Sequence, residues 1–174
     1  MPRNTLLPFI FCSLVVLAIQ PMLAQSGPTA SSLAGSWEFT LTPTPGPMAN
    51  PVAILIGGLA TLTTDGSLVE TDTTEVVPVQ AGPGKPVVYG TPGHGIWQSG
   101  PAIGSWFVRF TSLVANSNGT LYAKRILSMT VMLNAPGNQF SGGYGFEVVD
   151  ITGRVITTGS GSVTGQLMVH PALP

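Results

Sequence analysis

Cysteine, histidine and charged side chains are all scarce in this sequence. The 174 residues include one cysteine, Cys12, and two histidines, and only 7% of the residues are charged. A single cysteine excludes a disulfide scaffold and a thiolate metal site. The two histidines do not form a pair at metal-ligand spacing. We therefore expect no metal and no cofactor, and stability must come from the burial of apolar side chains.

Basic residues are also few, which limits the kinds of partner. Lys and Arg number 6 against 7 Asp and Glu, so the net charge is −1. Nucleic-acid binding depends on basic patches that neutralise phosphates, and the sequence has no such patch. We expect no nucleic-acid partner.

The N-terminal segment has the features of a secretory signal peptide. Arg3 carries its positive charge, residues 6–19 are mostly apolar, and Pro21 shortly precedes Ala24. This pattern predicts cleavage near Ala24 and a secreted or periplasmic protein. The apolar stretch is shorter than the about 20 residues of a spanning helix, so we expect no membrane span after cleavage. The expected organisation is a signal peptide over 1–24, a flexible leader over 25–34, one domain over 35–168 and a tail over 169–174.

Alternation of apolar and polar residues predicts eight strands and no helix. Trp37, Phe39 and Leu41 share one face of the first strand, with polar side chains on the other, as is typical of a half-buried strand. Asp65-Gly66, between two such segments, predicts a hairpin turn. The expected strands cover residues 35–42, 52–64, 67–73, 94–98, 105–114, 120–133, 140–148 and 154–168.

These strands predict an all-β fold, an eight-stranded antiparallel up-and-down barrel of the calycin type. A two-sheet β-sandwich is the alternative, because a strand count does not separate the two architectures. A barrel of eight strands is either filled by its own side chains or holds one small ligand. Residues 75–93 are interrupted by proline and glycine, and they predict a long irregular loop, apart from a short β-prone run over residues 87–89.

Two resemblances follow from these motifs. Gly35-x-Trp37 resembles the lipocalin signature, which implies a tryptophan that closes the barrel floor; the late basic residue and the C-terminal helix of lipocalins have no counterpart here. The motif Pro92-Gly93-His94-Gly95-x-Trp97 resembles a group of uncharacterised bacterial secreted β-barrel proteins, and this resemblance implies no activity. Allene-oxide-cyclase-like barrels share the expected topology, although no motif points to them.

Four side chains are candidates to line a ligand pocket. Three are aromatic, Trp37, Trp97 and Tyr144, although aromatic residues at strand spacing are also typical of an ordinary core. The fourth, Arg125, shares a strand face with apolar residues. A cation facing the barrel interior needs a carboxylate or an anionic ligand beside it. Glu147, on the neighbouring strand, is its expected partner.

His94 and Glu147 are the candidates for catalysis, although no catalytic motif is present. An isolated imidazole can act as a general base near neutral pH, but His94 between glycines is also typical of a structural turn. We expect an exported barrel that binds a small apolar or amphipathic molecule. Two alternatives remain. One is a filled barrel with a structural or interaction role. The other is a cofactor-free cyclase or isomerase, in which the cavity shape and one or two polar groups such as His94, Arg125 and Glu147 steer a reactive substrate. The sequence does not indicate the oligomeric state.

Overall fold

A computed structural model describes residues 32–45, 55–77, 79–80 and 87–169 of the chain. The predicted signal peptide, most of the predicted leader and most of the tail lie outside these residues. No helix in the described part of the chain has the length and apolar character needed to cross a membrane.

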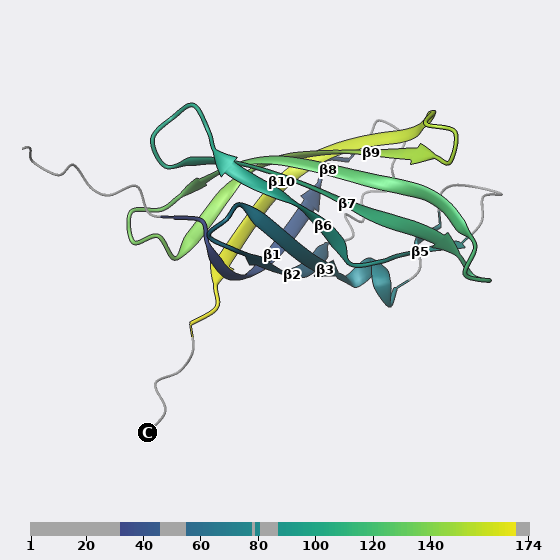
Figure 1. The fold of residues 1–174 in the computed structure, drawn as a ribbon, viewed down its shortest axis with the longest axis horizontal. Helices are drawn as coiled ribbons and strands as arrows, with labels where there is room; N and C mark the ends of the chain where they lie inside the picture. The colour runs from purple at the N-terminus through teal and green to yellow at the C-terminus, as the bar shows by residue number, and fades with distance from the viewer. Residues whose placement is uncertain (1–31, 46–54, 78, 81–86, 170–174) are drawn as a thin grey trace, which may run out of the picture.

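Eight strands form a closed antiparallel barrel (Figure 1). Each strand of the ring pairs with its neighbours in chain order, and the last strand pairs with the first. This arrangement confirms the all-β, up-and-down barrel and excludes the sandwich. The eight strands are β1 Gly35–Pro43, β2 Ile56–Leu62, β3 Ser67–Asp72, β6 Gly93–Ser99, β7 Ser105–Asn116, β8 Leu121–Leu133, β9 Gln139–Asp150 and β10 Val155–Leu167.

The strands differ in length, and this difference shapes the two ends of the barrel. Strands β7 to β10 have 12 or 13 residues, whereas β1, β2, β3 and β6 have 6 to 9. The pairing of β1 with β10 stops at Pro43 opposite Gly161, while β10 continues along β9 to Val155. The long strands therefore extend beyond the short ones at one end of the barrel (Figure 1).

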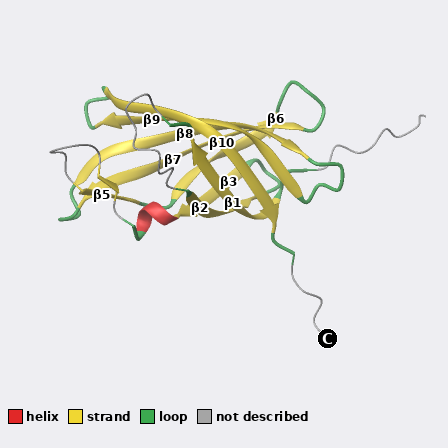
Figure 2. Cartoon of the chain, turned by 180° about the vertical axis from the view of Figure 1, so that it is seen from behind, coloured by secondary structure: helices red, strands yellow, loops and turns green. Residues whose placement is uncertain are grey.

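Three short elements lie beside the end of the barrel where the long strands extend beyond the short ones, which we call the overhanging end. Strand β5, Val87–Gly90, pairs with the last residues of β7 outside the closed ring, and β4, Val79–Gln80, pairs with β5. The 3-10 turn η1, Thr73–Glu75, follows β3 and is drawn red in Figure 2. The loop predicted over 75–93 thus contains a strand at Val87–Gly90, in a segment where sequence alternation is too short to be distinctive.

The core fills the other end of the barrel. Trp37 and Phe140 pack with ring centroids 5.0 Å apart, and Trp97 and Trp106 pack edge to face at 5.1 Å. Leu33, two residues before β1, is only 1% exposed and joins this cluster. The indole Nε1 of Trp37 donates a hydrogen bond to the Leu33 carbonyl at 2.9 Å. The chain entering β1 therefore closes this end of the barrel.

Candidate functional site

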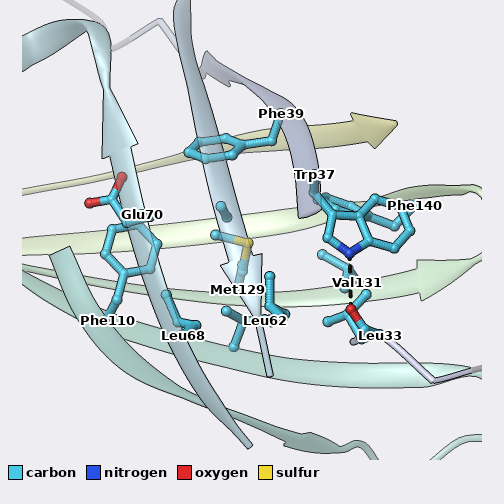
Figure 3. Close-up of a pocket in the computed structure, with 12 residues that line it drawn as sticks. Leu33, Trp37, Phe39, Leu62, Leu68, Glu70, Phe110, Met129, Val131 and Phe140 are labelled. Carbon is cyan, nitrogen blue, oxygen red and sulfur yellow. Dashed lines mark hydrogen bonds between the residues drawn. The ribbon is translucent and has the colours of Figure 1, made fainter. Parts of the chain in front are cut away.

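The closed end of the barrel has almost no free space. A cavity among its described core residues measures about 20 Å³, room for about one water molecule. Figure 3 shows Trp37, Phe39, Phe110 and Phe140 among its lining side chains. A cavity of this size has no room for a ligand.

The other end encloses a much larger cavity of about 430 Å³. This volume lies within the range of small-molecule pockets, roughly 300–1,000 Å³. Its walls come from the end of β1, the start of β2 and the overhanging parts of the long strands. They are mostly apolar, with Leu41, Val88, Leu127, Phe146, Val148 and Ile156 among them.

Glycines in β10 keep this cavity open. Tyr144 of β9 lies directly opposite Gly161, and Phe146 lies opposite Gly159. A β-carbon at either glycine would overlap the aromatic ring. The rings therefore lie flat across the neighbouring strand, an arrangement known from edge glycines packed by aromatics. Gly159 and Gly161 therefore make room for these rings.

Arg125 stands at one side of the cavity, within a hydrogen-bonded cluster. Strand alternation turns it inward, as predicted, between the buried Ala123 and Leu127. Its Nη2 donates to Asp72 Oδ2 at 2.7 Å, and its Nε donates to Ser112 Oγ at 3.0 Å. The side chain is 12% exposed, so the guanidinium is held in place by a carboxylate with little competition from water.

Asp72 can hold Arg125 because it also caps η1. Its Oδ1 accepts a hydrogen bond from the Thr74 backbone N–H at 2.8 Å. Glu75 accepts in return from the Asp72 backbone N–H at 3.2 Å, which completes a capping box. Both carboxylates therefore serve the cap of η1. Among the described residues no group of three His, Cys, Asp or Glu could hold a metal ion.

Glu70 is a second carboxyl next to this cluster. It is 1% exposed, and neither carboxyl oxygen has a hydrogen-bond partner among the described residues. Oε1 lies 3.5 Å from Arg125 Nη2. Burial, reinforced by the charge of Asp72, raises the pKa of Glu70 from its usual 4.5 to about 8, despite the opposing effect of Arg125. The neutral form of Glu70 is therefore favoured near pH 7, and Asp72, whose Oδ2 lies 2.7 Å from Nη2, is the counterion of Arg125.

The predicted site residues separate into three places. Arg125 and Tyr144 line the large cavity. Trp37 lines the small cavity of the closed end, and Trp97 donates a hydrogen bond there to the Thr63 carbonyl at 2.9 Å. These two tryptophans belong to the filled core.

His94 and Glu147 lie on the outer wall of the barrel and are exposed. The predicted Arg125–Glu147 pair does not form. Glu147 alternates with the inward Phe146 and Val148, so it faces away from Arg125. Asp72 takes its place as the partner of Arg125.

The glycines beside His94 have a packing role. A β-carbon at Gly93 would overlap the Glu70 carboxyl, and one at Gly95 would overlap the backbone of β7. Close packing against Glu70 and against β7 therefore explains the glycines of this motif. They do not indicate a role for the exposed imidazole of His94.

Neither Glu70 nor Asp72 was predicted as a site residue from the sequence. The spacing of Glu70 and Asp72 along the sequence could have indicated that both face the barrel interior. Leu68, Glu70 and Asp72 alternate along β3, so the two carboxyls share a face with an apolar residue. A lone inward arginine on another strand is a natural partner for such a pair.

Comparison with protein-family models and with curated proteins gives no match. The resemblances to lipocalins and to secreted bacterial barrels therefore stay predictions. The function has to be argued from the cavity and its lining.

Proposed function

We propose that this protein binds a small, largely apolar molecule in the cavity of about 430 Å³ at the overhanging end of the barrel. The observation that carries the proposal is the contrast between the two ends. At the closed end, side chains leave a cavity with room for about one water molecule. At the other end, Gly159 and Gly161 keep the large cavity open. A barrel that needed only stability would gain from filling this space.

The cavity lining supports an amphipathic ligand. Most of the wall is apolar, and the polar groups on it are Arg125, Thr74, Tyr122, Tyr144 and Thr157. A few polar groups in an apolar pocket fix the orientation of a bound molecule. We further propose that the protein acts as an exported carrier, on the strength of its signal-peptide pattern.

The geometry favours binding over the cyclase or isomerase alternative. That alternative needs one or two polar groups, with His94, Arg125 and Glu147 as the candidates, to face a bound substrate. His94 and Glu147 are exposed on the outer wall, whereas Arg125 lines the cavity. A molecule in the cavity would therefore meet Arg125 but neither His94 nor Glu147.

Val148 and Val149 allow a matched test of the cavity. Val148 lines it, and its neighbour Val149 alternates to the opposite face of β9. Val148→Trp should therefore reduce binding of a neutral apolar dye such as Nile red, followed by its fluorescence. Val149→Trp introduces the same side chain on the outside and should bind like the wild type. Equal binding by the two variants, or no binding by the wild type, would contradict the proposal.

A further inference from the structure

The charges around the cavity define which kind of ligand it takes. Arg125 is the one charged side chain among the described residues lining the cavity, and the other polar groups there are hydroxyls. Its charge is already compensated by Asp72 at 2.7 Å. A lone arginine in an apolar pocket would attract an anionic ligand. Here the Asp72 carboxylate already neutralises the charge of Arg125.

The hydrogen bonds of Arg125 leave little room for a second anion. A guanidinium has five N–H groups. One on Nε goes to Ser112, one on Nη1 goes to Thr74 at 3.3 Å, and one on Nη2 goes to Asp72. The second N–H of Nη2 is on the nitrogen that lies 3.5 Å from Glu70. The second N–H groups of Nη1 and Nη2 thus have no acceptor among the described residues, and Nη2 already lies beside the Glu70 carboxyl.

An anionic headgroup would be unfavourable at this position. It would lose its hydration and enter beside the Asp72 carboxylate and the buried Glu70 carboxyl, while the single guanidinium is already neutralised. A buried charge without its own counterion costs several kcal/mol in general. A neutral oxygen can accept a hydrogen bond from a free N–H without that cost.

We infer that the cavity selects neutral amphipathic molecules with one hydrogen-bond acceptor, such as long-chain alcohols, esters or ketones, over carboxylates with the same chain. The inference rests on the proposed binding function and specifies its ligand class. The raised pKa of Glu70 supports it, because a neutral Glu70 leaves the cluster with one positive and one negative charge at pH 7.

The test compares 1-decanol with decanoate, which share one chain length and differ in charge at pH 7. Each is titrated against the Nile red complex of the exported, purified protein. Decanol should displace the dye at a concentration about tenfold lower than decanoate, or lower still. Decanoate binding as tightly as decanol would overturn the inference while leaving the proposed function intact. Failure of decanol, decanoate and Nile red to bind would overturn both.

A double variant tests the role of the carboxyls directly. Glu70→Gln with Asp72→Asn keeps both side-chain shapes, and asparagine remains a good cap for η1. It leaves Arg125 without either of its two carboxyl neighbours. Decanoate should then bind about tenfold more tightly than to the wild type, with decanol nearly unchanged. No gain for decanoate in a folded double variant would contradict the inference, and the wild-type comparison decides it independently of how this variant folds.

Discussion

Replacing Glu70 by glutamine should stabilise the protein in a pH-dependent way. Glu70 is buried to 1% exposure without a hydrogen-bond partner among the described residues. Its pKa is raised from 4.5 to about 8, chiefly by burial. In the unfolded chain the carboxyl ionises near its usual pKa. Between these two values the native state therefore holds a proton that the unfolded state has lost.

This difference sets the sign and the size of the effect. Because the native state binds the extra proton, the wild type loses stability as the pH rises from 4.5 to about 8. At about 1.4 kcal/mol per pH unit, the loss reaches about 5 kcal/mol at most. Glutamine resembles the protonated carboxyl and does not titrate. Glu70→Gln should therefore match the wild type near pH 4.5 and exceed its stability by about 3–5 kcal/mol at pH 8.

Urea unfolding at a series of pH values measures this directly, with far-ultraviolet circular dichroism as the signal. Glu147, exposed on the outer wall, is the matched control. Glu147→Gln should change the free energy of unfolding by less than about 0.5 kcal/mol at each pH. A constant difference between Glu70→Gln and the wild type across the series would refute the reasoning, as would a less stable variant at pH 8.

Two further substitutions test the cluster and the cavity wall by the same unfolding assay. Asp72→Ala removes the counterion of Arg125 and the cap of η1, so it should cost about 3–5 kcal/mol at pH 7; a loss below about 1 kcal/mol would contradict the assigned pairing. Gly161→Ala places a methyl group against the Tyr144 ring and the backbone of β1, and it should cost about 1–3 kcal/mol. Gly143→Ala, on the open outer face, should be nearly neutral, and equal losses at the two glycines would rule out this explanation.

The barrel could be predicted from the sequence because its strands and turns are specified locally. Alternation is clear in β1 and β7, and the hairpin turns contain glycines at positive φ, such as Gly66 and Gly153. Glycine adopts this conformation at little cost. Up-and-down pairing then follows from short connections between consecutive strands.

The site could be predicted only in part, because it depends on contacts between distant strands. Arg125 was placed inward by alternation, but its partner Asp72 is 53 residues away in the chain. Which strands meet across the interior depends on their stagger and lengths, which no local pattern gives. For the same reason the sequence could not show that Trp37 and Trp97 lie at the filled end and Tyr144 at the hollow one.

Native mass spectrometry of the protein purified gently from its host tests the central claim most directly, because it detects a molecule held in the cavity. The wild type should carry a small neutral adduct, either from its host or after incubation with 1-decanol, and Val148→Trp should carry less of it. A bare protein mass under both conditions, or an adduct unaffected by Val148→Trp, would contradict the assignment of the cavity of about 430 Å³ as a binding site.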